Sequence, residues 1–234
     1  EPIKPPIQYD FRPFSFQTSQ ITPTIRPLKL KDQSASDVYG GYVSAGYGNY
    51  ASPYLEGFIN SKRDKNKLVG AHAYLNSSAK GPVDGKNSGG GTAGLSLYAK
   101  SFSEYVSFSG DLEFENRATH FYGYVPGSDL KPGDIRQSYN FFKLSGDLAN
   151  TKNTAFSYKL GAGFSYMADK FDAKETEVDL DFNGGYEIGD ESSIGIKAGY
   201  AVITRKDAAI EATPRSLFAI NPTFIFYPVE DLRL

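Results

Sequence analysis

The two histidines, His72 and His120, are the residues of this chain best suited to general acid–base chemistry. A hydrolase would need one of them beside a nucleophile and a third group that orients the ring. Ser96 and Asp111 are expected on the same face of strands near His72, so such a site stays open as an alternative. The pattern favours a histidine that is hydrogen-bonded to neighbouring polar groups. We therefore predict no catalytic residues and no enzymatic activity.

The sequence also gives little indication of a metal-binding site or a phosphate-binding loop. Glu175, Glu177, Asp179 and Asp181 follow one another at a spacing of two, which marks the polar face of a strand rather than a Ca²⁺ site. Two scattered histidines are too few donors for a metal centre. The glycines at 89–91 are not followed by the Gly-Lys-Ser/Thr of a phosphate-binding loop, so they predict a loop tip. We expect neither a metal nor a cofactor.

The composition excludes several classes of protein. The 234 residues include 25 basic and 27 acidic ones, so the net charge of −2 lacks the footprint of a nucleic-acid-binding protein. The absence of cysteine excludes disulfide scaffolds, cysteine-based zinc sites and thiol catalysis. No segment approaches the ~18 consecutive apolar residues of a membrane-spanning helix, and the mean hydropathy is −0.41.

The elements that would position these residues are strands, because apolar residues recur at every second position. Between residues 106 and 115 the apolar set is Val106, Phe108, Gly110, Leu112 and Phe114. The intervening set is Ser107, Ser109, Asp111, Glu113 and Glu115. The same alternation recurs about ten times, and no window has a sustained helical period. The sequence therefore predicts an all-β protein.

The connections between these strands alternate in length. Short polar turns are expected at 63–67, 101–104, 150–153 and 189–192. Longer connections are expected at 77–91, 117–137, 168–174 and 205–215, and only the hairpin at 49–53 is short on that side. An antiparallel up-and-down meander places all short turns at one end and the long loops at the other.

This pattern favours a transmembrane barrel over a soluble sandwich or calyx. One face of each strand carries Gly, Ser and charged residues, and the other is aliphatic and aromatic. At ~3.3 Å per residue and a tilt near 45°, about ten residues span roughly 23 Å, the height of an outer-membrane apolar band. We predict an antiparallel up-and-down transmembrane β-barrel in the outer membrane of a Gram-negative bacterium, in contact with its lipid. Short turns would face the periplasm, and longer loops would be extracellular.

The polar faces would then line the barrel lumen. The predicted lumen-lining residues are His72, Lys100, Asp111, Glu113, Glu115, Lys143, Asp147, Lys159, Glu177, Asp179, Asp181 and Lys197. Opposite charges can pair across a narrow interior and fill it, or line a water-filled path in a wider one. Aromatic residues near strand ends predict membrane-interface girdles. These are Tyr105, Tyr122, Tyr124, Tyr166, Tyr186 and Tyr227.

Residues 1–37 differ from the rest, because Pro2, Pro5, Pro6, Pro13, Pro23 and Pro27 remove backbone donors and fix φ. We expect an extended segment, periplasmic or docked in the lumen, followed by membrane-spanning strands at 38–234. The segment is either a tail or linker, or a surface that docks on a partner.

Several short motifs resemble those of TonB-dependent-receptor-like outer-membrane barrels of the Bacteroidetes type. They begin with Pro5-Pro6-Ile7 and Thr22-Pro23-Thr24-Ile25-Arg26-Pro27-Leu28-Lys29-Leu30, and continue with Tyr42-Val43-Ser44-Ala45-Gly46-Tyr47-Gly48-Asn49-Tyr50-Ala51-Ser52-Pro53-Tyr54 and Asn60-Ser61-Lys62-Arg63. Asn76-Ser77-Ser78-Ala79-Lys80-Gly81 and Thr119-His120-Phe121-Tyr122-Gly123-Tyr124 follow in the same order. The resemblance implies further strands beyond Leu234, hence a partial chain of a larger barrel. Neither a plug domain nor a TonB box is recognisable, so energised uptake by this chain is not expected.

Beside the hydrolase alternative at His72 or His120, two non-enzymatic functions remain open at this stage. The first is an outer-membrane barrel with a non-enzymatic transport or envelope role, as the resemblance implies. The alternative is a structural or scaffold subunit of an outer-membrane complex that binds other envelope proteins through residues 1–37 and the extracellular loops. In both cases we expect the protein to contact lipid and not to bind nucleic acid.

Overall fold

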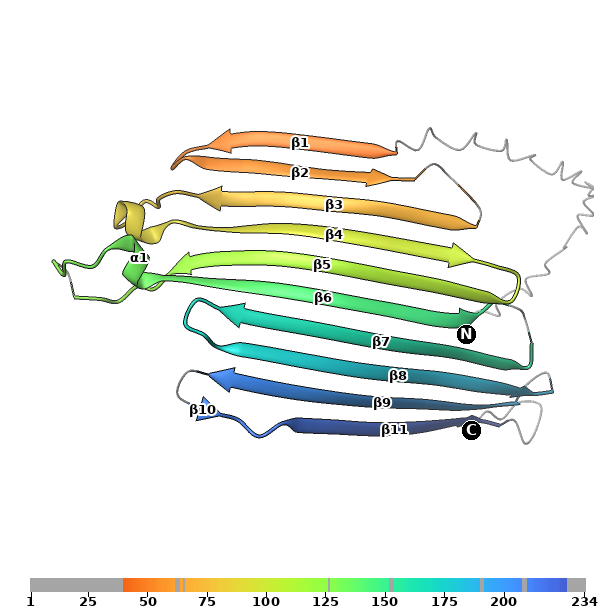
Figure 1. Ribbon diagram of the computed structural model, residues 1–234. Helices are drawn as coiled ribbons and strands as arrows, with labels where there is room; N and C mark the ends of the chain where they lie inside the picture. The colour runs from red at the N-terminus through yellow and green to blue at the C-terminus, as the bar shows by residue number, and fades with distance from the viewer. Residues whose placement is uncertain are drawn as a thin grey trace, which may run out of the picture. The chain divides into compact units, whose positions relative to one another are not determined.

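The computed structural model describes residues 40–61, 64, 66–125, 127–151, 154–189, 192–207 and 210–226. These residues form one antiparallel sheet, in which each strand lies beside its neighbour in the sequence (Figure 1). The strands are β1 (Gly41–Gly48), β2 (Ser52–Asn60), β3 (Lys67–Ser78), β4 (Gly90–Phe102), β5 (Val106–His120), β6 (Arg136–Asn150), β7 (Phe156–Asp169), β8 (Lys174–Ile188), β9 (Ser192–Asp207), β10 (Ile210–Glu211) and β11 (Arg215–Ile225). The prediction of an all-β, antiparallel up-and-down fold is confirmed.

The sheet has ten strand positions, as expected, because β10 and β11 share one. Both pair with β9, β10 at its last two residues and β11 along residues 193–203. Strands β10 and β11 therefore together form one interrupted strand beside β9. The predicted segment at 1–37 and Tyr227 lie outside the described residues.

The register separates two faces without a break. Directly opposed residues of antiparallel strands point to the same side. One rung of directly opposed residues, taken from β2 to β9, reads Ile59, Ala71, Leu97, Leu112, Leu144, Phe164, Val178 and Val202. We call this side the apolar face and the other the polar face. Every Asp and Glu of β1 to β9 lies on the polar face.

Connections between consecutive strands lie at the two ends of the sheet, and the two long ones, which join β3 to β4 and β5 to β6, share one end (Figure 1). The connections at 49–51 and 170–173 lie at that same end and are short, so the prediction of a long connection at 168–174 is wrong, because residues 168, 169 and 174 belong to strands. The tight turns join β2 to β3, β4 to β5, β6 to β7 and β8 to β9, and we call their side the turn end. The opposite side, the loop end, holds a 3₁₀ turn at Gly85–Ser88 and the one-turn helix α1 (Pro132–Ile135). Several strands are longer than the stretch of about ten residues that would span an apolar band, reaching 15 in β5 and 16 in β9. Residues assigned to loops by their polarity still pair with the neighbouring strand.

No other described element covers either face of the sheet. Ile135 is the one buried apolar side chain in the described part of the chain, and Gln137 the one buried polar side chain. On the apolar face, Val43 is 76% exposed and Leu144, in the middle of the sheet, is 49% exposed. Strands β1 and β11 each pair with a single described strand. No described helix is long and apolar enough to cross a membrane.

Candidate functional site

All twelve residues predicted to line a lumen lie on the polar face. One rung across it joins His72 of β3 to Ser96, Glu113, Lys143, Ser165 and Glu177 of β4 to β8. Lys100, Asp111, Glu115, Asp147, Lys159, Asp179, Asp181 and Lys197 occupy positions of the same parity on their strands. That this face lines a lumen stays a prediction.

His72 has a partner that the sequence reasoning missed. Its Nε2 lies 3.2 Å from Oε1 of Glu56, and the Tyr54 hydroxyl donates to the other oxygen of that carboxylate at 2.5 Å. Ser96 occupies the position directly opposite His72, yet no hydrogen bond joins the two side chains in the described residues. Asp111 lies on β5, two strands from His72. The site thus contains an acid and a base, but it lacks the nucleophile–base contact of a hydrolase.

A second cluster on the polar face involves Tyr74, whose hydroxyl donates to Glu115 Oε2 across two strands. Arg117 Nη2 contacts Glu115 Oε1 at 2.8 Å, so both oxygens of the carboxylate are occupied. The Tyr74 ring covers Gly94, which lies directly opposite it; a Cβ on Gly94 would meet ring atoms at 2.5 Å. Glycine is therefore required at position 94 by the approach of the ring.

The remaining charges of the polar face are loosely paired. Lys159 Nζ lies 3.1 Å from Asp147 Oδ1, with the two side chains 55% and 41% exposed. Asp179 and Asp181 stand beside glycines 163 and 161 of β7, which leave room around the carboxylates. Among the described residues, no group of three or more His, Asp or Glu side chains is arranged to hold a metal ion. The face is polar and carries both signs of charge.

The apolar side chains of the apolar face form a band across the strands, and this apolar band is staggered relative to the rungs of directly opposed residues. On β1 the band covers residues 43–47, and its midpoint is Ala45. On β9 it covers residues 194–202, and its midpoint is Ala198. The rung through Ala45 reaches β9 at Lys206, eight residues beyond Ala198, after eight strand-to-strand steps. The band thus shifts by one residue per strand. With ~3.3 Å per residue and ~4.8 Å between strands, its long axis is inclined by about 35° to the rungs.

The tyrosines predicted for interfacial girdles occupy different surroundings. Tyr166 and Tyr186 lie on the apolar face, near the loop end and the turn end of their strands respectively. Tyr105 stands in the turn before β5. Tyr122, in the loop after β5, is 95% exposed. The hydroxyl of Tyr124 donates to Asp84 at 3.2 Å and so joins two loops.

Hydrogen bonds hold the loop end together around Asp169, the last residue of β7. Gln137 Nε2 donates to its Oδ2 at 2.8 Å, and the backbone N–H groups of Phe171 and Ala173 donate to Oδ1 at 2.8 Å. Burial acts to raise the pKa of Asp169, and these hydrogen bonds outweigh it, so the pKa lies below its ordinary value of 3.8.

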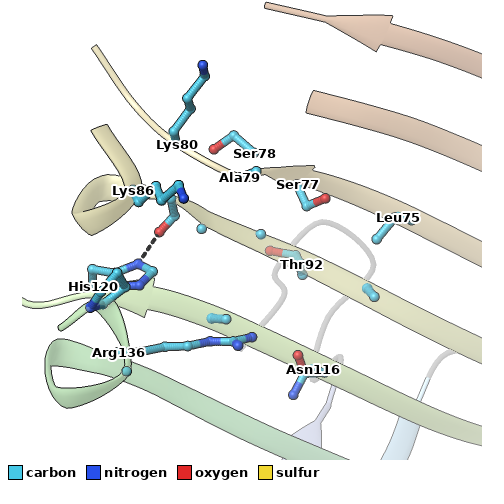
Figure 2. A pocket seen from close by; sticks show the side chains of 17 residues that line it. Leu75, Ser77, Ser78, Ala79, Lys80, Lys86, Thr92, Asn116, His120 and Arg136 are labelled. Carbon is cyan, nitrogen blue, oxygen red and sulfur yellow. Dashed lines mark hydrogen bonds between the residues drawn. The ribbon is translucent and has the colours of Figure 1, made fainter. Parts of the chain in front are cut away.

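A pocket of about 660 Å³ lies where the apolar face meets the loops of β3 to β6 (Figure 2). Leu75, Ala93 and Ala118 line its strand side. Lys80, Lys86, His120 and Arg136 line it from the loop ends. The His120 Nδ1–H donates to the Gly89 carbonyl at 2.5 Å, shown as the dashed line in Figure 2, which leaves Nε2 as the remaining ring nitrogen.

No protein-family model matches the chain, and no curated protein matches it significantly. The resemblance to TonB-dependent-receptor-like barrels therefore stays a prediction from its short motifs.

Proposed function

We propose that this chain is an integral outer-membrane β-barrel protein of a Gram-negative bacterium with a non-enzymatic transport or envelope role. The observation that carries the proposal is the staggered apolar band. A barrel strand crosses the bilayer at a tilt of ~35–45°, so the apolar band of a barrel must shift along each successive strand. The shift of one residue per strand corresponds to about 35°, at the lower end of that range.

The exposure of the apolar face supports lipid as its environment. Val43, Leu144 and Phe218 are 76%, 49% and 69% exposed and belong to β1, β6 and β11, so the uncovered surface runs over the full width of the sheet. A soluble sandwich buries such a face under a second sheet about 10 Å away. The described residues contain no such sheet.

The positions of the charged residues also favour lipid as the environment of the apolar face. Twelve strand positions of β1 to β9 are Asp or Glu, and each points to the polar face, away from the proposed lipid. Charges on a lipid-facing surface cost the most at the bilayer midplane and little near its interfaces. On the apolar face the only charged residues of β1 to β9 are Lys67, Arg136, Lys174 and Lys206, all at or next to a strand terminus.

A non-enzymatic role is favoured by the polar face. His72 is hydrogen-bonded to Glu56 and forms no hydrogen bond with a hydroxyl group among the described residues. Lysines and carboxylates share that face, which suits a filled barrel or a water-filled path according to the number of strands in the assembled barrel. Within this class we propose a TonB-dependent-receptor-like barrel, on the motifs that suggested it.

The proposal is tested by folding the full chain into detergent micelles and comparing its electrophoretic migration with and without boiling. A barrel should resist unfolding by dodecyl sulfate until it is heated, and should therefore migrate differently in the two lanes. Circular dichroism of the same samples should show β-structure in micelles and little in their absence. Identical migration of the two samples, or a folded sheet in plain buffer, would contradict the proposal.

A further inference from the structure

The cations of the apolar face are unequally distributed between the two ends of the sheet, and the proposed function does not explain this. It has four cations and no anion within β1 to β9, and three of the four, Arg136, Lys174 and Lys206, lie at the loop end. Lys174 and Lys206 are directly opposed on neighbouring strands, where their like charges repel. Snorkelling alone would explain cations at both ends of the strands. At the turn end, strands β1 to β9 place only Lys67 on the apolar face.

The loop-end pocket continues this cationic region and lies on the same face. Leu75, Ala93 and Asn116 form one rung of the apolar face, and Ser77, Gly91 and Ala118 form the next. Arg136 is directly opposed to His120 at the edge of the pocket. Most of the strand residues that line the pocket therefore lie on the same face as the apolar band.

The basic residues of the pocket have no acidic partners among the residues that the structure describes. None of the described residues that line it is Asp or Glu. Lys80, Lys86 and Arg136 form no ion pair within the described part of the chain, whereas Arg117 and Lys159 of the polar face are each paired with a carboxylate. Asn116, which also lines the pocket, hydrogen-bonds to Asn140 at 2.8 Å and is neutral. The cationic charge is thus available to a ligand.

We propose that this pocket binds the phosphate-bearing headgroup of an outer-leaflet lipid, with Lys80, Lys86 and Arg136 as the phosphate ligands. The inference rests on the proposed outer-membrane location. The loop end is then the extracellular side, because short turns of such barrels are periplasmic. Lipid acyl chains would lie along Leu75 and Ala93, since these residues begin the apolar band directly below the pocket.

Two features favour a lipid over free phosphate. The pocket volume of about 660 Å³ accommodates a headgroup much larger than one phosphate ion, and its strand side is apolar. Lys174 and Lys206 extend the cationic region along the same face, where further headgroups of the leaflet would lie. A free anion would gain nothing from an apolar surface beside it.

The test measures lipid binding to the full chain folded in a neutral detergent, by native mass spectrometry. The probes are diphosphorylated lipid A, zwitterionic phosphatidylcholine and inorganic phosphate. We expect saturable binding of lipid A, much weaker binding of phosphatidylcholine, and no competition by equimolar phosphate. Competition by inorganic phosphate at the concentration of lipid A would overturn the assignment to a lipid, and equal affinity for the two lipids would overturn the site.

The variant with Lys80→Gln, Lys86→Gln and Arg136→Gln should lose affinity for lipid A by on the order of a hundredfold, about fivefold for each charge removed. The matched control removes three charges from the polar face, through Lys143→Gln, Lys197→Gln and Arg215→Gln. We expect its affinity to stay within about twofold of the unsubstituted chain. Equal losses in the two variants would show that only net charge matters and would refute the site.

Two further measurements keep the outcomes separate. Heat-modifiable migration in neutral detergent reports on the barrel without any anionic lipid, so its loss in the unsubstituted chain refutes the proposed function and not merely this site. Its retention without preference for lipid A refutes the site alone. If the triple variant does not fold, Lys80→Gln and Lys86→Gln are made singly, since both residues lie outside the strands; unchanged affinity in each would overturn the proposal.

Discussion

The cost of placing an arginine on the sheet should depend on its height along the apolar band. Alanine occurs at three suitable positions, so one substitution can be compared without changing the starting residue. Ala162 of β7 faces the apolar side, opposed to Leu180 and Gly146. Ala168 lies on the same face near the loop end of β7. Ala201 of β9 lies on the polar face, opposed to Asp179.

The register gives the height of each position. The line through the band midpoints Ala45 and Ala198 crosses β7 at Ala162, because the rung of Ala45 meets β7 at Ala168, six strand steps from β1. Six residues at ~3.3 Å and a tilt of about 35° place Ala168 roughly 16 Å above mid-height. That is beyond half of a band about 25 Å tall.

The expected penalties follow from these heights. Ala162→Arg should lower the free energy of unfolding by about 2–4 kcal/mol, and Ala168→Arg by about 0–1 kcal/mol. Ala201→Arg should change it by less than about 1 kcal/mol, because the guanidinium remains on the polar face beside a carboxylate.

The measurement is urea unfolding of each variant in phosphatidylcholine vesicles, with the folded fraction taken from heat-modifiable migration. The decisive comparison is between Ala162→Arg and Ala168→Arg, which lie on the same face of the same strand at different heights. Equal penalties at these two positions, or a larger one for Ala201→Arg, would refute both the lipid-facing assignment and the calculated tilt.

Two further predictions concern the polar face and the loop end. Gly94→Ala should lower the free energy of unfolding by about 1–3 kcal/mol in the same assay, because the new Cβ meets the Tyr74 ring. Gly46→Ala, whose Cβ would have no atom nearer than 3.8 Å, is the control, and an equal effect of both would contradict the close-approach argument. The lowered pKa of Asp169 contributes stability above its unfolded value near 3.8, and that contribution is lost as the pH falls through the still lower folded-state value. Urea midpoints should therefore show Asp169→Asn less stable than the unsubstituted chain at pH 6, with the difference shrinking below pH 4; a constant difference would exclude the ionised carboxylate as its source.

The faces of the strands were predictable from the sequence because a strand has a strict period of two. Alternation from Val106 to Glu115 assigns each of those side chains correctly, and the same rule assigned His72 and Lys197 to the polar face. Loop lengths gave the up-and-down order, since short connections can join only antiparallel neighbours.

Contacts between strands were not predictable in the same way. They depend on the register between strands, which the period of a single strand does not contain. Glu56 was therefore missed as the partner of His72, and Tyr74 as the partner of Glu115. The cations Arg136, Lys174 and Lys206 were missed for another reason: their polarity assigned them to loops, although all three pair within the sheet.

The continuous apolar face has a consequence for the chain before it folds. Each rung of that face contains one residue from each strand. Along a single strand, the residues that belong to the face are two positions apart. No unfolded segment therefore displays a long apolar stretch, and a secretion machinery that retains helices of about 20 apolar residues finds none to retain in the strands. On the proposed function, the surface that contacts lipid forms only when the strands pair, so the polypeptide would be exported as a water-compatible chain and would insert into the membrane at its destination.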